Sequence, residues 1–144
     1  YTTGSGGYTK STTPSIWPSK GVITSPYGSR VDPVTGAASA FHEGVDIADD
    51  YGTPIVATAA GTVTFAGYTE GGYGNLVEID HGNGFVTRYG HNSAVLVTPG
   101  MTVKQGQVIA LMGSTGKSTG AHVHYEVRIN GSAVDPMVFL PISN

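Results

Sequence analysis

Four residues of this chain stand at spacings that can build a metal site. His42 precedes Asp46 by four residues in the segment FHEGVD, and one residue separates His122 from His124 in GAHVHYE. Side chains alternate along a β-strand, so His122 and His124 share a face and lie roughly 6.6 Å apart along it. A spacing of four keeps His42 and Asp46 on one face of a strand, and it would also do so on a helix. Both pairs can therefore reach one small cavity.

These residue types predict a zinc site of the hydrolytic kind. Catalytic zinc takes three protein ligands, commonly histidines and a carboxylate, and keeps a fourth position for water. His42, Asp46 and one of His122 and His124 supply such a set. If all four residues bound the metal, the site would be closed and structural, and the spacing alone leaves that alternative open.

Composition limits the other functions that the chain can have. Only 12% of its 144 residues are charged, the net charge is −3 and Lys and Arg form no cluster, which argues against a nucleic-acid partner. No apolar run approaches the roughly 20 residues of a membrane-spanning helix. The absence of cysteine excludes disulfides, thiolate ligands and a cysteine nucleophile.

The chain is expected to hold one domain behind a tether. Residues 1–14 are polar and rich in Gly, Ser and Thr, which is typical of a flexible linker, so the folded domain is placed at residues 15–144. Because the chain starts at Tyr1 without Met or a signal segment, we expect a processed piece of a longer protein. The sequence leaves open whether an upstream region would regulate the domain, anchor it or bind a partner.

An all-β architecture must position the candidate ligands. Short alternating or β-branched runs are bounded by Gly, Pro and Asn, and no stretch has a convincing helical period. The expected strands cover residues 54–59, 61–66, 75–80, 85–90, 103–104, 108–112 and 122–129. Hairpin turns are predicted at the HGNG stretch and at Asn130 and Gly131. Glycine-rich loops, TEGGYG and GSTGKSTGA, fall between strands where they could wall a groove, with Gly72, Gly74 and Asn75 shaping it.

The chain resembles the lysostaphin-type, or LytM-like, zinc metallopeptidases, which are peptidoglycan endopeptidases. The resemblance covers about residues 15 to 140. It rests on the ordered segments ITSPYGSR, FHEGVDIA, GTPIVATAAGTV, GGYGNLVEIDHGNGF, RYGHNS, VKQGQVIALMGSTGKSTGAHVHYEV and VDPMVFL. It implies an antiparallel all-β fold, the duplicated hybrid motif, with a groove walled by loops.

The resemblance also implies a role for each histidine of the site. His42, Asp46 and His124 would hold Zn²⁺, while His91 and His122 would be catalytic. This division is chemically reasonable, because zinc lowers the pKa of its bound water and histidine can serve as both the base and the acid that hydrolysis needs. Which of the two catalytic histidines is the base stays open.

Separate expectations concern Glu126, His81 and a tyrosine that some relatives carry. Glu126 shares the strand face of His122 and His124, so it could orient a ligand or act as a carboxylate base. His81 stands beside Asp80 in the predicted turn, and we expect a solvated residue without a catalytic role. Some relatives carry a tyrosine before the first zinc histidine that helps to polarise the substrate; none stands there in this chain, and Tyr51 or His91 would have to replace it.

The favoured function is a zinc endopeptidase that cuts stem or cross-bridge peptides of bacterial peptidoglycan at bonds flanked by Gly or Ala. The family resemblance places such an enzyme outside the cell or in the cell envelope. One alternative is a non-catalytic module of the same fold that binds peptidoglycan or a protein partner. Another is a lipoyl or biotinyl carrier domain, suggested by VKQGQVIALMG, but neither Lys104 nor Lys117 lies in the tight hairpin that a carrier requires.

Overall fold

The computed structural model describes residues 14–31, 38–116 and 120–141, so residues 1–13 of the predicted tether and Lys117 lie outside the described residues. Within this part of the chain, regular structure is almost entirely β-strand, apart from a 3-10 turn, η1 (Pro136–Val138). The strands are β1 (Val22–Ser25), β2 (Gly28–Val31), β3 (Ala38–His42), β4 (Val45–Ala48), β5 (Pro54–Val56), β6 (Gly61–Thr69), β7 (Gly74–Gly82), β8 (Phe85–Asn92), β9 (Ala94–Val95), β10 (Thr102–Val103), β11 (Val108–Leu111), β12 (His122–Ile129) and β13 (Ser132–Val134). Across the described residues, no helix is long and apolar enough to cross a bilayer.

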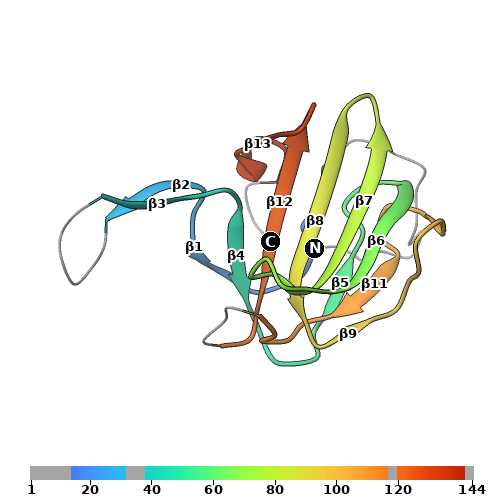
Figure 1. Cartoon of the computed structure of the whole chain (residues 1–144), viewed down its shortest axis with the longest axis horizontal. Coiled ribbons are helices and arrows are strands. Elements are labelled where there is room, and N and C mark those ends of the chain that lie inside the picture. Colours follow the sequence, from blue (N-terminus) through green and yellow to red (C-terminus); the bar gives the residue numbers. More distant parts are fainter. Residues whose placement is uncertain (1–13, 32–37, 117–119, 142–144) are drawn as a thin grey trace.

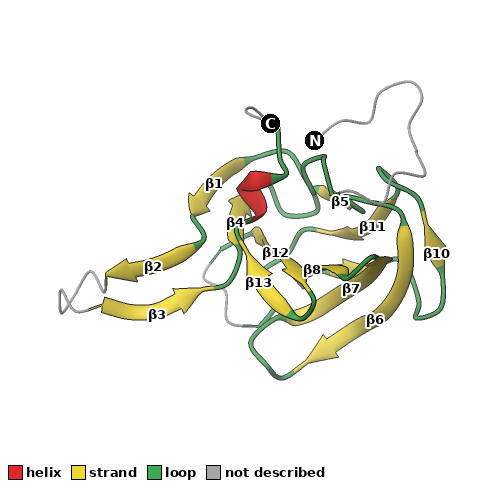
Figure 2. Cartoon of the chain, turned by 90° about the horizontal axis from the view of Figure 1, so that it is seen from above, coloured by secondary structure: helices red, strands yellow, loops and turns green. Residues whose placement is uncertain are grey.

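Two antiparallel sheets form the body of the molecule. The larger has the order β1-β4-β12-β8-β7-β6-β10, with β13 paired to the end of β12, and the smaller has the order β5-β11-β9. A separate hairpin of β2 and β3 extends to one side and leads directly into β4 (Figure 1). Figure 2 shows β5 and β11 stacked over the curved larger sheet. The predicted all-β, antiparallel fold is therefore confirmed.

Apolar side chains from both sheets meet in one core. Ile47, Ile79 and Tyr125 come from the larger sheet and Ile55 and Ile109 from the smaller, and all five are fully buried. Each buried side chain of this size stabilises the fold by roughly 1.5–3 kcal/mol relative to an exposed one. Their contact therefore holds the two sheets together.

The chain before β1 also packs onto this core. Trp17 is 4% exposed within the core cluster, and the side-chain amide of Gln105 donates to Ser15 Oγ at 3.0 Å. The carbonyl of Pro18 accepts from the backbone N–H of Val56 at 2.8 Å. Ser15, Trp17 and Pro18 thus contact the folded body, while the limits of the domain stay a prediction.

The strand predictions succeed where alternation or turn chemistry is strong. β12 has the predicted bounds, β6, β7 and β8 run longer than predicted, and both Asn-Gly turns are confirmed. Asn83, Gly84, Asn130 and Gly131 all have positive φ, from 51° to 87°, which a two-residue type I′ hairpin requires. β5 is shorter than predicted because the N–H of Thr58 donates to the Tyr89 hydroxyl instead of a neighbouring strand. Strands β1 to β4, β9 and β13 were not predicted.

His81 is not the solvated turn residue that the sequence led us to expect. It is 4% exposed, near the end of β7, and it shares the inward face of that strand with Ile79 two residues earlier. Its Nδ1 donates to the carbonyl of Ala60 at 2.8 Å, and its Nε2 accepts from the hydroxyl of Thr87 at 2.7 Å. The prediction was wrong because β7 continues through His81 and the turn begins only at Asn83.

The bonds of His81 begin a buried chain of polar groups. Thr87 Oγ1 lies 2.7 Å from the Tyr89 hydroxyl, which lies 3.1 Å from Thr58 Oγ1, and Thr58 Oγ1 lies 2.7 Å from the Tyr125 hydroxyl. Burial is the main cause that lowers the pKa of His81 below its ordinary 6.5, although the bond to Ala60 and the charge of Asp80 oppose it. His81 is therefore held neutral inside the fold.

The neutral state of His81 predicts a pH-dependent stability. Because the unfolded chain takes up this proton more readily, stability should be fully present above about pH 6.5 and decline as the pH falls towards the lowered folded pKa. His81→Ala should cost roughly 1–3 kcal/mol at pH 7.5, since Thr87 and Ala60 lose a partner. The difference in unfolding free energy between the wild type and His81→Ala should shrink as the pH falls. Urea unfolding between pH 5 and pH 8 measures it, and a difference that does not change with pH would contradict this account.

Candidate metal centre

Three neighbouring strands of the larger sheet carry most of the predicted site residues. β12 lies between β4 and β8, and its register places His124 opposite Asp46 on one side and Gly90 on the other. His91 follows Gly90 in β8, and His122 lies two residues before His124 on β12. Strand pairing thus brings together imidazoles that are far apart in the sequence.

His42 joins this cluster by a route that the sequence did not predict. We expected His42 and Asp46 on one face of a single strand or helix, but His42 ends β3 and Asp46 lies within β4. The chain bends between them at Gly44, which packs against β12. A Cβ at Gly44 would collide with the carbonyl oxygen of Tyr125, so glycine permits this close approach. The two side chains meet across the bend.

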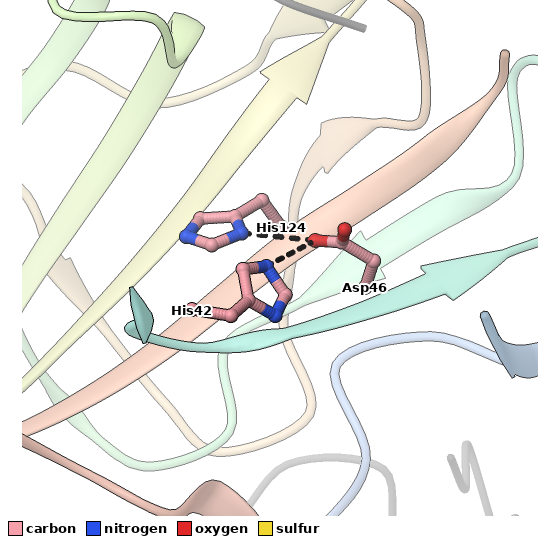
Figure 3. Close-up of side chains that lie close together, drawn as sticks. All are labelled: His42, Asp46 and His124. Atoms are coloured by element: carbon pink, nitrogen blue, oxygen red, sulfur yellow. Dashed lines mark hydrogen bonds and ion pairs between the residues drawn. The ribbon is translucent and has the colours of Figure 1, made fainter. Parts of the chain in front are cut away.

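One carboxylate oxygen is the centre of the cluster. Asp46 Oδ1 lies 2.9 Å from His124 Nδ1, 3.3 Å from His42 Nε2 and 3.8 Å from His122 Nε2. Figure 3 shows the rings of His42 and His124 beside this oxygen. The possible ligand atoms of His42, Asp46 and His124 all lie within 4.8 Å of one another. Ligands about 2.1 Å from zinc are roughly 3.4 Å apart in a tetrahedron, so this set can fit one ion after small movements.

Backbone carbonyls orient the imidazoles of His42 and His122. Nδ1 of His42 donates to the carbonyl of Pro26 at 2.8 Å, and Nδ1 of His122 donates to that of Gly120 at 2.9 Å. A carbonyl only accepts, so each Nδ1 carries hydrogen and the neutral ring keeps its lone pair on Nε2. In both residues Nε2 is the atom that approaches Asp46. This is the arrangement that a metal ligand or a proton acceptor needs.

His124 lies between two carboxylates. Its Nδ1 is 2.9 Å from Asp46 Oδ1, and its Nε2 is 2.8 Å from Glu126 Oε2. Burial disfavours the charged ring, but the bonds to both carboxylates outweigh burial and raise the pKa of His124 to about 9. Burial also disfavours the charged forms of the carboxylates, yet bonds from His124 and His42 hold the pKa of Asp46 well below its usual range. Bonds from His124 and Tyr73 lower that of Glu126 to about 2. The site therefore favours positive charge.

His91 stands beside the three possible ligands in an unusual backbone conformation. Its ring centroid is 4.6 Å from that of His122 and 6.0 Å from that of His124. Its φ of 66° is left-handed, a conformation that costs a non-glycine residue on the order of 1–3 kcal/mol unless its surroundings hold it. Its N–H donates to the carbonyl of Tyr73 at 2.6 Å and its Nδ1 to that of Thr115 at 2.6 Å. Burial lowers the pKa of His91, which favours the neutral ring.

The two glycine-rich loops meet next to His91. Thr115 Oγ1 donates to the carbonyl of Asn92 at 2.8 Å and accepts from the N–H of Asn75 at 3.0 Å. Gly74, with φ of 68°, lies so close to Thr115 that a Cβ would collide with its backbone. The predicted role of Gly74 and Asn75 in shaping the site therefore has a physical basis, because they fix one loop against the other.

Tyr73 is a site residue that sequence reasoning missed. Its hydroxyl donates to Glu126 Oε2 at 2.6 Å, and its ring centroid lies 5.7 Å from that of His124. Tyr51, suggested as a substitute for the missing tyrosine, is instead 69% exposed in the turn after β4. The sequence did offer one signal for Tyr73. It is a large aromatic residue inside the glycine-rich segment GGYGN, so it has few side chains nearby in the sequence to pack against.

Comparisons with known proteins identify the family of this chain. Residues 40–136 match the profile of peptidase family M23. The chain is 49% identical over 120 residues to the DD-carboxypeptidase/endopeptidase Mpg of Neisseria meningitidis, a match that covers 83% of this chain and 27% of that protein. It is 40% identical over 125 residues to the murein hydrolase activator NlpD of Escherichia coli, covering 87% of this chain and 31% of that protein. The chain thus spans about a quarter to a third of the length of these relatives.

Solved structures give the same result. A zinc-containing peptidase from Vibrio cholerae superimposes with a TM-score of 0.77 at 38% identity, over 84% of this chain and 38% of that one. The catalytic domain of lysostaphin from Staphylococcus simulans superimposes with a TM-score of 0.73 at 34% identity, over 82% of this chain and 90% of that one. The resemblance drawn from sequence is confirmed: the chain belongs to peptidase family M23 and has the lysostaphin-type fold.

Proposed function

We propose that this chain is a zinc-dependent endopeptidase domain that hydrolyses peptide bonds of bacterial peptidoglycan, in stem or cross-bridge peptides at positions flanked by Gly or Ala. The observation that carries the proposal is the convergence of His42, Asp46 and His124, with His91 and His122 directly beside them. The names of the Neisseria relative and of the lysostaphin domain, an endopeptidase and an antimicrobial peptidase, support the same activity.

The three-residue set suits zinc. Two imidazoles and one carboxylate match its preferred ligands, and two neutral rings with one negative charge would leave the site positive. When bound, zinc supplies Lewis acidity, which polarises a peptide carbonyl and lowers the pKa of a water ligand. His42 and His124 present Nε2 and Nδ1, respectively, to the same carboxylate, so the donor atoms already face one point.

His91 and His122 would carry the proton transfers. Both rings keep Nδ1 bonded to a backbone carbonyl, so each ring would exchange its proton through Nε2. Burial keeps His91 neutral near pH 7, which suits a residue that accepts a proton or donates a hydrogen bond to a developing oxyanion. Cleavage needs one group to accept a proton from water and another to protonate the departing amine, and this pair supplies both.

A second candidate function is a non-catalytic module that activates other cell-wall enzymes. The similarity to a relative named murein hydrolase activator supports it. The presence of all five site residues favours the enzyme, since a module that only binds has no need of an ordered set of ligands and proton carriers. In both cases the target is peptidoglycan or its hydrolases, which implies a location in the cell envelope or outside the cell. The greater length of the relatives is compatible with an upstream regulatory or anchoring region.

The metal assignment predicts which substitutions remove zinc. The purified protein should hold close to one zinc per chain, and His42→Ala, Asp46→Ala and His124→Ala should each reduce occupancy sharply, because each removes one of three ligands. His91→Ala and His122→Ala should retain the metal. Elemental analysis of desalted protein measures this. If His122→Ala also lost the metal and the wild type were inert, the site would be closed and structural.

The proton-transfer roles predict a different pattern in turnover. His91→Ala and His122→Ala, compared at equal zinc content, should each lower kcat by roughly a hundredfold or more, the usual scale for a positioned acid or base. Circular dichroism serves as the folding control. A His91→Ala protein that folds normally and turns over at the wild-type rate would contradict the catalytic role of His91.

The substrate proposal predicts selective cleavage of small, extended peptides. Glycine-rich loops beside the site should admit a backbone with Gly or Ala at the scissile bond and exclude bulky side chains. Short mimics with Gly-Gly, D-Ala-Gly and D-Ala-diamino-acid junctions are incubated with the protein beside a casein control, and mass spectrometry identifies the products. Cleavage of at least one mimic should stop with a strong chelator and return with added zinc. Digestion of casein alone would refute a cell-wall substrate, and no cleavage of any substrate would favour the activator.

A further inference from the structure

Glu126 is a buried carboxylate that contacts a candidate metal ligand but not the centre of the cluster. Its side chain is 2% exposed, and it lies on β12 two residues after His124. A buried carboxylate is stable only when charged and polar partners replace water. Oε2 accepts from the Tyr73 hydroxyl at 2.6 Å and from His124 Nε2 at 2.8 Å, and Oε1 accepts from Arg128 Nε at 2.9 Å. Both oxygens are therefore committed to fixed donors.

These partners determine which nitrogen of His124 faces the metal centre. An ionised carboxylate only accepts hydrogen bonds, so Nε2 of His124 must carry hydrogen and Nδ1 is the nitrogen left to bind an ion. Tyr73 fixes Oε2 in place from the other side. The backing of His42 differs, because a neutral carbonyl, that of Pro26, holds its Nδ1. A charged acceptor makes a ring a more basic ligand than a neutral acceptor does.

The ion pairs of Glu126 and Arg128 extend to the segment that carries His42. Arg128 Nη2 lies 2.8 Å from Glu43 Oε2, and Glu43 directly follows His42 in the sequence. Gly44, the next residue, lies against Glu126, where a Cβ would stand 3.0 Å from Glu126 Cγ. Glu126, Arg128 and Glu43 thus connect β12 to the bend that positions His42.

From these contacts we propose that Glu126 is a positioning residue for the metal centre. It fixes the tautomer of His124 and raises its strength as a ligand, while Tyr73 orients the carboxylate and Arg128 balances its charge. The inference rests on the proposed function for the metal centre, that is, for zinc and for His124 as one of its ligands. It makes Glu126 neither a metal ligand nor the general base, because its carboxylate is committed to His124 Nε2, Tyr73 and Arg128.

The test compares zinc affinity in three variants of the same network. Glu126→Gln keeps the shape but has a single oxygen, which cannot serve both His124 and Arg128. Tyr73→Phe removes one bond to Oε2 and leaves the charge. Glu78→Gln is the matched control, because Glu78 pairs with Arg88 at 2.6 Å, in the same group of charges, and its carboxylate belongs to that pair instead of to His124. Competition with a chelating indicator gives the zinc Kd, and the visible spectrum of the Co²⁺-substituted protein reports the ligand environment.

Zinc affinity should fall roughly 10- to 100-fold in Glu126→Gln, the scale of a lost partner behind a ligand, and by a smaller factor in Tyr73→Phe. The Co²⁺ spectrum should change in Glu126→Gln, while Glu78→Gln should match the wild type in both measurements. If Glu126→Gln does not fold, as judged by circular dichroism, Tyr73→Phe decides the outcome.

Two results would overturn the inference: wild-type zinc affinity in both Glu126→Gln and Tyr73→Phe, or an equal loss in Glu78→Gln, which would show a general effect of charge. These results are separate from the proposed function. A wild type that binds zinc but cleaves no mimic would refute the peptidase, and the affinity comparison would still decide the role of Glu126.

Discussion

The register of β12 between β4 and β8 is the constraint on which the site depends. Alternate residues of this strand, Val123, Tyr125 and Val127, are fully buried in the core, so His122 and His124 must face the opposite way. A slip of one residue would expose those apolar side chains and turn both imidazoles inward, at a cost of several kcal/mol. The hydrophobic core therefore fixes the chemistry of the other face, and the same register sets Asp46 opposite His124.

Charge in the site is organised around this strand. Two carboxylates, Asp46 and Glu126, bracket one imidazole, and Arg128 and Arg88 compensate the deeper carboxylate from the far side. The field that raises the pKa of His124 to about 9 would also attract a metal cation, so protons and the proposed metal ion would compete for one location. Neutral carbonyls orient His42 and His122, which keeps excess negative charge away from the outer rings.

Sequence reasoning worked where a local rule decides the structure. Period-two alternation placed His122 and His124 on one face, and the Asn-Gly pairs predicted both hairpin turns. Sequence reasoning failed where contacts between residues far apart in the chain decide the structure. The meeting of His42 with Asp46 depends on the bend at Gly44, which needs β12 beside it, and Tyr73 acquires its role only because its loop reaches Glu126.

His81 shows the limit of such local reasoning. The polar neighbour Asp80 suggested that His81 lies in a turn. Continued alternation from Ile79 predicts instead that His81 is buried, and His81 is buried in the structure. Spacing alone left open whether His122 or His124 is the ligand, and the choice of His124 came from the family resemblance. The roles of the site residues and the limits of the domain stay predictions.

The left-handed backbone of His91 has a consequence for how this site can diversify. Its main chain and ring are bonded to the carbonyls of Tyr73 and Thr115, one in each glycine-rich loop, so the imidazole and these two loop positions form one mechanical unit. An insertion or deletion that moved the carbonyl of Tyr73 or Thr115 would displace the ring together with the loop. For the proposed enzyme, new substrate preferences would therefore arise more readily through exchange of outward side chains, such as the exposed Glu70, than through changes in loop length. In the proposed enzyme, the backbone spacing of the scaffold would set the position of the reacting group, and side chains on the loop surface would set specificity.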